Sequence, residues 1–259
     1  MTIFYALIFG IVEGISEFLP ISSTGHLILT AQLLQLPQTE FLKSFEIAIQ
    51  LGAIGSVVVL YFKSLLVDWE TIKRLAVAFI PTGVIGLGLY KLVKHFLLGN
   101  SSIVLWSLFI GGIFLILFEL FYKEKPEAVS DIRFMTYKQA VLIGLCQSLA
   151  IIPGVSRSAA TILGGLSLGL KRKTIVEFSF LLAIPTMLAA TVLDLAKNVH
   201  IFTSDQFGFL AVGFFSSFVI AILAIKFFLG YIAQHNFMVF GIYRIAMVLL
   251  MLILGKLNG

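Results

Sequence analysis

Residues 13–26 read Glu-Gly-Ile-Ser-Glu-Phe-Leu-Pro-Ile-Ser-Ser-Thr-Gly-His and lie in otherwise apolar sequence. The stretch holds two carboxylates, a proline, a run of hydroxyls and an imidazole. Such groups are costly in an apolar segment and usually serve a function there. Residues 147–161 read Gln-Ser-Leu-Ala-Ile-Ile-Pro-Gly-Val-Ser-Arg-Ser-Ala-Ala-Thr and look like a diverged copy. We expect the two stretches to meet and form one site.

The composition places the chain in a lipid bilayer. Of its 259 residues, 59% are hydrophobic and 12% are charged, whereas about a quarter are charged in soluble domains. In a membrane protein, a net charge of +5 reflects the orientation of the loops and their contact with lipid headgroups. We therefore expect no nucleic-acid partner. The single Cys146 excludes an internal disulfide. Because the N-terminal apolar run lacks a cleavage site, we expect residue 1 onward to be the mature chain.

Six segments are apolar over about the 20 residues that a membrane-spanning helix needs. They are Phe41–Phe62, Leu75–Leu98, Ile103–Tyr122, Thr174–Leu195, Phe207–Gly230 and Phe237–Gly255.

Two further regions have a break at a proline. Thr2–Leu36 is interrupted at Pro20, and Tyr137–Leu170 is interrupted at Pro153. Each arm has about 15 residues, which is short for a span, and proline disfavours helix at the residue before it. We therefore predict two re-entrant helix hairpins. Such segments are tolerated only where they are buried in protein or line a wet cavity.

The predicted fold is an all-α integral membrane protein made of two similar units. Residues 1–259 form a single membrane domain, with repeat 1 at about 1–122, a charged connector at 123–138 and repeat 2 at about 139–259. Each repeat consists of one re-entrant hairpin followed by three transmembrane helices. Because that is an odd number of crossings, the second repeat is inverted. Inverted repeats place their shared site near the middle of the membrane.

The lysines and arginines are distributed unequally between the two faces of this topology. The face that holds the connector carries more of them, so we expect it to be cytoplasmic. Both chain termini then point outward. The first hairpin enters the membrane from the outer side and the second from the cytoplasm. Arg157 and Arg244 are left inside the membrane. We expect Arg244 to pair with an acidic residue or a lipid headgroup.

Glu13 and Glu17 lie four residues apart, and therefore on one face of a helix. Two carboxylates can hold a hard divalent cation such as Mg²⁺ or Ca²⁺. They can also share or relay a proton, because neighbouring like charges favour one protonated form. A purely structural pairing with an arginine is the alternative.

The hydroxyls of Ser22, Ser23 and Thr24 follow the break, where a helix restarts. Hydroxyl residues are common N-caps, and capping alone would explain at least one of them. A helix N-terminus also binds anions through its N–H groups and dipole. A spare hydroxyl becomes a nucleophile where a base lies close, and His26 is a candidate base, since imidazole titrates near neutral pH. We expect Glu13 or Glu17 to orient this imidazole.

Arg157 lies at the predicted tip of the second hairpin and requires an anion. A guanidinium binds phosphate oxygens through two hydrogen bonds and keeps its charge. Ser156, Ser158 and Thr161 can donate hydrogen bonds beside it, and Gly154 permits close approach of the backbone to a ligand. An ion pair with one of the carboxylates of the first stretch is the alternative.

These motifs resemble those of the undecaprenyl-diphosphate phosphatase family, of the bacitracin-resistance type. The resemblance rests on residues 13–26 and 153–161, and on Phe-Glu-Ile-Ala-Ile-Gln-Leu-Gly at 45–52 and Glu-Phe-Ser-Phe through Pro185 at 177–185. It covers almost the whole chain in order and spacing.

The resemblance implies an enzyme of the bacterial inner membrane with an outward-facing site. Its substrate would be a polyprenyl diphosphate lipid, the C55 carrier released during peptidoglycan synthesis, and its product the monophosphate. It also implies a divalent cation at Glu13 and Glu17, an essential His26, Ser23 as nucleophile, and Arg157 clamping the diphosphate. Our residue-based reading leaves Ser23, His26 or water as the attacking group. It also leaves the oligomeric state open, a homodimer included.

A transporter is the second hypothesis, because inverted repeats with broken helices are typical of transporters. Such a protein would flip a lipid phosphate or carry a small anion.

Overall fold

A computed structural model describes residues 1–37, 39–63, 68–92, 101–198 and 206–257. The regular structure in these ranges is helical, apart from one isolated bridge between Val129 and Leu170. The α-helices are α1 (Ile3–Ser16), α2 (Ser23–Leu33), α3 (Glu40–Leu60), α5 (Trp69–Leu92), α6 (Ser101–Phe121), α7 (Tyr137–Ser148), α8 (Arg157–Ser167), α9 (Arg172–Asn198), α10 (Phe207–Ile232) and α11 (Met238–Leu257). Short 3-10 helices lie at η2 (Ile132–Phe134) and η3 (Leu149–Ile151).

Five described helices are long and apolar enough to cross a membrane, namely α3, α5, α6, α9 and α10. This confirms the prediction of an all-α membrane protein with several spans. The sixth predicted span corresponds to α11. Its apolar part, Met238–Ile253, is shorter than the five candidate spans. The last residues predicted for the second span, 93–98, lie outside the described ranges.

Helix α5 begins at Trp69, earlier than the predicted Leu75. The polar start of this helix is stabilised locally. The Asp68 carboxylate accepts hydrogen bonds from the Thr71 N–H at 3.2 Å and the Thr71 hydroxyl at 2.7 Å, as an N-cap does. Hydropathy alone therefore placed the start of this helix too late.

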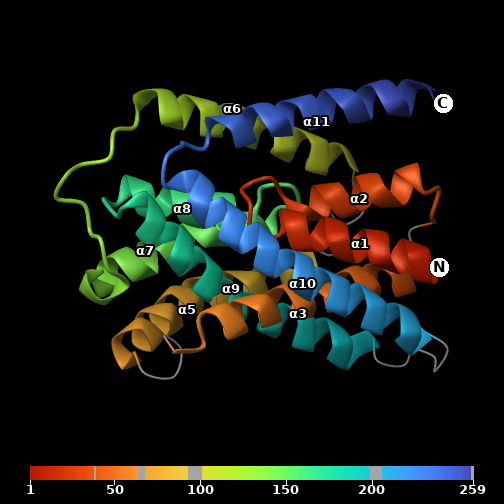
Figure 1. Cartoon of the computed structure of the whole chain (residues 1–259), viewed down its shortest axis with the longest axis horizontal. Coiled ribbons are helices and arrows are strands. Elements are labelled where there is room, and N and C mark those ends of the chain that lie inside the picture. The colour runs from red at the N-terminus through yellow and green to blue at the C-terminus, as the bar shows by residue number, and fades with distance from the viewer. Residues whose placement is uncertain (38, 64–67, 93–100, 199–205, 258–259) are drawn as a thin grey trace.

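Both predicted breaks are present, and each separates two short helices. The chain leaves α1 before Pro20 and restarts at α2, and it leaves η3 before Pro153 and restarts at α8. The two pairs lie toward opposite ends of the molecule, α1 and α2 at the end where both termini lie and α7 and α8 toward the other (Figure 1).

The two restarting helices have the same unusual N-terminal backbone. Ser22 precedes α2 with φ 69° and ψ 96°, and Ser156 precedes α8 with φ 75° and ψ 114°. Positive φ is uncommon for a residue with a side chain. Strained backbone of this kind is found at ligand clamps and active sites. Its presence at matching positions marks both breaks as candidate parts of one site.

The C-terminal ends of α2 and α8 also match. Gln35 and Gly169 follow these helices with φ 52° and 82°. A hydrogen bond from Leu36 N–H to the Ala31 carbonyl (2.9 Å) recurs as Leu170 N–H to the Gly165 carbonyl (3.1 Å). The similarity of the two stretches in sequence is thus a similarity in backbone geometry.

Each first arm packs against a helix from the other half of the chain. Helix α1 contacts α10, and α7 contacts α5. A side chain at Gly10 would lie 1.9 Å from the Ser216 hydroxyl, and one at Gly144 would lie 2.0 Å from the Ala78 carbonyl. These small residues let the helix backbones approach closely, as in other membrane helix pairs.

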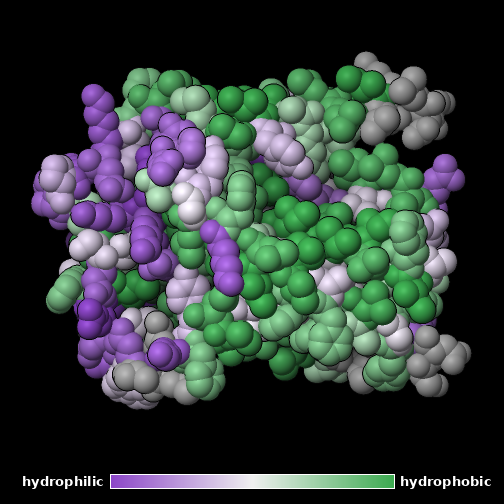
Figure 2. All heavy atoms as spheres, viewed as in Figure 1, coloured by the Kyte–Doolittle hydropathy of each residue, from purple (hydrophilic) through white to green (hydrophobic). Residues whose placement is uncertain are grey.

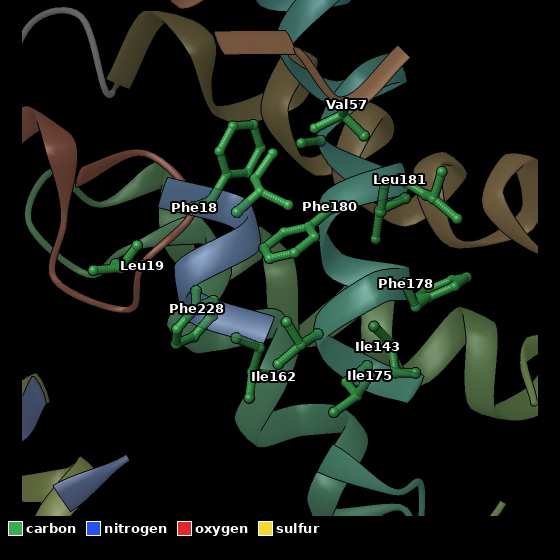
Figure 3. Packing of buried hydrophobic residues seen from close by; sticks show 14 of the residues in the cluster. Phe18, Leu19, Val57, Ile143, Ile162, Ile175, Phe178, Phe180, Leu181 and Phe228 are labelled. Carbon is green, nitrogen blue, oxygen red and sulfur yellow. The ribbon is translucent and has the colours of Figure 1, made fainter. Parts of the chain in front are cut away.

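A buried aromatic cluster surrounds the first break. The Phe18 ring packs edge-on against Phe180 of α9 at a centroid distance of 5.3 Å, and Phe180 contacts Phe228 of α10 at 6.1 Å. Figure 3 shows these rings converging from three segments. Edge-to-face aromatic pairs add to the stability gained by burial. The residues on either side of Phe18 are therefore held firmly within the protein.

Hydrophilic residues gather at one end of the molecule. In Figure 2 they cover the left end, where Figure 1 places α7 and the start of α5, while hydrophobic residues cover most of the remaining visible face. Both termini lie at the opposite end (Figure 1). A polar end beside an apolar belt is the surface expected of a chain inserted in a bilayer.

A buried ion pair ties three helices together. The Glu119 carboxylate, at the end of α6, accepts hydrogen bonds from both terminal nitrogens of Arg172 at the start of α9 and from the Phe237 N–H just before α11. The Arg172 guanidinium also lies 5.1 Å from the Phe237 ring centroid.

We expect Glu119→Ala to destabilise the folded protein by about 3 kcal/mol, because it leaves the largely buried Arg172 and the Phe237 N–H without their acceptor. Thermal unfolding in detergent measures the change. Glu127→Ala, at an exposed position of the connector, is the matched control and should unfold like the unmodified protein. Equal unfolding temperatures for the two variants would contradict a stabilising role of this ion pair.

Candidate active site between the two breaks

A cavity of about 150 Å³ lies between the two broken segments. The first segment contributes Glu17, Ser22, Ser23 and Thr24, and the second contributes Gly154, Ser156 and Arg157, all of them predicted site residues. The remaining lining residues are Gln50, Ala150, Pro153 and Met187. The structure therefore brings the two stretches together around one space, as the sequence predicted.

Arg157 and Glu17 form an ion pair across this cavity. The Arg157 Nη2 donates to Glu17 Oε1 at 2.8 Å, and Nη1 donates to the Ser179 carbonyl at 2.8 Å and its hydroxyl at 3.2 Å. The Arg157 Nε is buried and has no hydrogen-bond partner among the described residues. Buried donors are rarely left unpaired. An anionic oxygen in the cavity would supply the acceptor.

Ser23, the first residue of α2, donates its hydroxyl hydrogen to Glu17 Oε2 at 2.6 Å. Ser22 makes no side-chain cap of this helix, so simple capping does not explain its hydroxyl. The first N–H groups of an α-helix lack partners within the helix. The start of α2 therefore offers these donors, with the positive end of the helix dipole, at the cavity. Thr24 is exposed beside it.

His26 lies one turn further along α2 and is oriented differently from our expectation. Its Nδ1 is 2.8 Å from the Ser22 carbonyl oxygen, and its Nε2 is 2.7 Å from the Tyr243 hydroxyl of α11. The two rings are stacked at 5.5 Å. The prediction that Glu13 or Glu17 orients His26 is wrong, because this turn of α2 directs the imidazole toward α11. His26 does not line the cavity.

Glu13 is completely buried one turn before Glu17. Neither of its carboxylate oxygens has a hydrogen-bond partner among the described residues. Among the charged side chains around it, the Glu17 carboxylate has the largest electrostatic effect on Glu13. An unpaired carboxylate in such a place is costly unless a cation or proton accompanies it, and carboxylate oxygens are ligands that Mg²⁺ and Ca²⁺ prefer. The donor chemistry thus fits a divalent cation.

The described residues gather no group of three His, Cys, Asp or Glu side chains that could hold a metal ion. Glu13 and Glu17 would therefore supply two carboxylates and leave the other positions to a ligand and water. Mg²⁺ is commonly bound in this way, with one or two carboxylates and substrate phosphates.

Of the other hydroxyls of the second stretch, Ser158 bonds the first half and Thr161 bonds its own helix. Ser158 donates to the Leu19 carbonyl of the first break at 2.8 Å, and Thr161 donates to the Arg157 carbonyl at 2.8 Å. Both side chains are fully buried and neither lines the cavity. Ser156 does line it, while accepting a hydrogen bond from the Ala159 N–H.

Sequence reasoning missed several residues that support the site. Ser179 holds Arg157, Tyr243 holds His26, and Gln50 and Met187 complete the wall of the cavity. Gln50 and Ser179 lie within residues 45–52 and 177–185, two stretches that carried part of the resemblance. No local signal marks Tyr243, because its partner lies 217 residues earlier in the chain.

Arg244 was predicted to pair with an acidic residue or a headgroup, and this prediction is wrong. Its side chain is fully buried and donates to four backbone carbonyls. Two of them belong to Gly154 and Val155, directly before the N-cap of α8.

Comparison with known proteins gives consistent matches over nearly the whole chain. The family model described as bacitracin resistance protein BacA matches residues 6–250. The undecaprenyl-diphosphatase of Aquifex aeolicus is 54% identical over 245 residues, which cover 95% of each chain. That of Sulfurihydrogenibium sp. is also 54% identical, over 95% of this chain and 96% of its own. The Wolinella succinogenes protein of the same name is 50% identical, over 95% of both chains.

Proposed function

Because the chain belongs to the BacA family of bacitracin resistance proteins, we propose that it hydrolyses undecaprenyl diphosphate to undecaprenyl phosphate and inorganic phosphate. One observation carries the proposal. A guanidinium with an unpaired N–H, an uncapped helix N-terminus and a hydroxyl bonded to a carboxylate converge on one cavity. The product is the lipid carrier that peptidoglycan synthesis reuses. Bacitracin sequesters the diphosphate, so hydrolysis gives resistance.

The diphosphate binds where positive groups converge. The unpaired Nε–H of Arg157 and the first N–H groups of α2 donate to phosphate oxygens. Phosphoryl transfer is catalysed chiefly by positioning and by stabilising the charge that develops on these oxygens. The polyprenyl tail extends along apolar helix faces into the lipid.

Ser23 is the attacking group in this proposal. Its Oγ attacks the terminal phosphorus in line, and its proton passes to Glu17, the acceptor of its hydrogen bond. The bond between that phosphorus and the bridging oxygen breaks, and the polyprenyl monophosphate leaves. Water then hydrolyses the phosphoserine and releases inorganic phosphate. His26 positions the start of α2 through its bond to the Ser22 carbonyl.

Glu13 and Glu17 would hold a divalent cation, Mg²⁺ or Ca²⁺, beside the phosphates. Bound there, the cation would neutralise negative charge on the phosphate oxygens. The support is the buried, unpaired carboxylate of Glu13 next to Glu17.

We expect addition of Mg²⁺ or Ca²⁺ to EDTA-treated protein to raise its unfolding temperature, because a ligand that binds only the folded state stabilises it. At about 100 times the dissociation constant the gain is about 2.7 kcal/mol. Glu13→Gln should remove the response. A cation-induced shift of the same size in this variant would locate the cation elsewhere.

The two halves form an inverted repeat of re-entrant hairpins in this proposal, with the site open to the outer face. Four observations support it. The breaks share a backbone conformation, α1 and α7 each pack on the other half, the hairpins lie toward opposite ends, and the connector end is hydrophilic. A shared site between such repeats is expected near the midplane.

Cysteine labelling tests the orientation. The only native cysteine, Cys146, is first changed to serine, and Pro37→Cys or Lys125→Cys is added at exposed positions. In intact cells a membrane-impermeant maleimide should label position 37 and should not label position 125 until the cells are opened. The reverse pattern would place the α1–α2 hairpin on the cytoplasmic side.

The central test is phosphate release from undecaprenyl diphosphate by the purified protein in detergent, where no membrane gradient exists. An enzyme releases phosphate under these conditions. A protein that only flips a lipid phosphate or carries an anion releases none, and that outcome would replace hydrolysis with transport.

A further inference from the structure

Arg244 is a buried cation with no acidic partner among the described residues. Its Nε donates to the Leu108 carbonyl at 3.2 Å and Nη2 donates to the Ser107 carbonyl at 3.0 Å, both in the middle of α6. Nη2 also donates to the Gly154 carbonyl at 2.8 Å, and Nη1 donates to the Val155 carbonyl at 3.2 Å. Burying a charge is costly without compensation, and here four carbonyl dipoles supply it.

These contacts fasten the tip of the second break to α6. Gly154 has φ +93°, and a side chain there would lie 2.6 Å from the Val104 carbonyl and 2.9 Å from the Ser107 Cβ. The tip thus lies directly against α6, and Arg244 reaches from α11 to bond both partners. Gly154 and Val155 immediately precede Ser156 and Arg157, which line the cavity.

The structure leaves a space in α6 for this guanidinium. A side chain at Gly111 would lie 2.3 Å from the Arg244 Nη2, so only glycine fits without displacing it. Gly112 and Gly241 bring the two helices together beside it, since a Cβ on either would lie within 3 Å of the other's carbonyl oxygen. Close packing of α6 and α11 therefore places the Arg244 guanidinium within hydrogen-bond distance of the Gly154 and Val155 carbonyls.

We propose that Arg244 is a positioning residue for the proposed reaction, which sets the phosphate-binding geometry of the Ser156–Arg157 segment by holding the Gly154 and Val155 carbonyls. The inference rests on the proposed function.

The geometry of the peptide unit explains how Arg244 acts. In a planar trans peptide the C=O and N–H point in opposite directions. Fixing the Val155 carbonyl toward Arg244 therefore turns the Ser156 N–H away from Arg244. The same contact fixes the backbone from which the Arg157 side chain extends to Glu17. Arg244 thereby positions Arg157 without lining the cavity itself.

Replacing Arg244 tests the proposal through kinetics and binding. Arg244→Met is expected to lower kcat/KM about 100-fold, similar to the loss of a preorganised donor. Arg244→Lys is expected to remain at least about 10-fold low, because one ammonium cannot reproduce the planar set of donors. Affinity for farnesyl diphosphate should fall in parallel. Arg244→Met with kinetics and affinity within about threefold of the unmodified protein would overturn the proposal.

A double-variant comparison separates positioning from general stability. If Arg244 acts through the Arg157 segment, the two substitutions should not be additive. Adding Arg244→Met to the Arg157→Ala variant should then lower kcat/KM by less than about threefold relative to Arg157→Ala alone. A further loss near 100-fold in that background would assign Arg244 a role independent of Arg157 and overturn the inference.

Gly111→Ala provides a second route where Arg244→Met does not fold. The added methyl displaces the Arg244 guanidinium from α6 and leaves every cavity residue unchanged. Gly230→Ala, in α10 with open space around it, is the matched control. We expect a drop of about 10-fold or more for Gly111→Ala and none for the control, and equal activities would contradict the proposal. If the unmodified protein releases no phosphate, the proposed function fails, while farnesyl diphosphate affinity still tests Arg244.

Discussion

Arg157→Ala is expected to lower kcat/KM for phosphate release by about 1,000-fold or more, the range seen when an arginine that stabilises transferring phosphate is lost. Arg157 lines the cavity, its Nε has no hydrogen-bond partner among the described residues, and its terminal nitrogens are held by Glu17 and Ser179. No other arginine or lysine lines that cavity. Its removal leaves charge on the transferring phosphate without a guanidinium partner.

Arg157→Lys should recover little of this loss, because an ammonium cannot bond Glu17, Ser179 and a phosphate with the geometry of a planar guanidinium. Arg133→Ala removes an exposed arginine on the connector and serves as the control, with activity unchanged. Unfolding temperatures must be compared as well, since Arg157→Ala leaves Glu17 unpaired. Near-normal turnover by a folded Arg157→Ala protein would refute the phosphate clamp.

Glu17→Gln is expected to lower kcat by about 1,000-fold, in the middle of the range for loss of acid–base catalysis. The amide has nearly the same shape but cannot accept the Ser23 proton. It also removes the negative charge that holds Arg157. Steady-state kinetics on undecaprenyl diphosphate measure the effect. Glu127→Gln, on the exposed connector, should match the unmodified protein.

Combining Glu17→Gln with Ser23→Ala tests whether the two residues act as one unit. Residues that share a catalytic step are strongly non-additive. The double variant should therefore be about as slow as either single one. If Ser23→Ala alone keeps normal turnover, the nucleophile is water or another group, and the serine mechanism is wrong.

The parts of the site that the sequence revealed are those encoded locally. Pro20 and Pro153 predicted the breaks, and the polar residues beside them predicted a shared site, because charge in apolar sequence is conspicuous. Local spacing does not say which way a side chain turns once helices pack. His26 faces Tyr243 of α11 rather than a carboxylate on α1, and only tertiary packing decides this.

Arg244 illustrates the same limit. A guanidinium in an apolar helix suggests an ionic partner, but carbonyls can satisfy it where two helices and a loop present them together. That arrangement depends on glycines of α6 lying opposite α11. The spacing along one helix could not reveal it. Helix positions were more predictable, because hydropathy over a whole span averages out such local detail.

The exchange of first arms between the two halves has a consequence for biogenesis. The glycine-lined face of α1 is completed only by α10, which leaves the ribosome late in synthesis. Until α10 is made, Gly10 and Gly14 on this face of α1 have no helix packed against them. A chain truncated before α10 would therefore leave the glycine face of α1 without its partner helix.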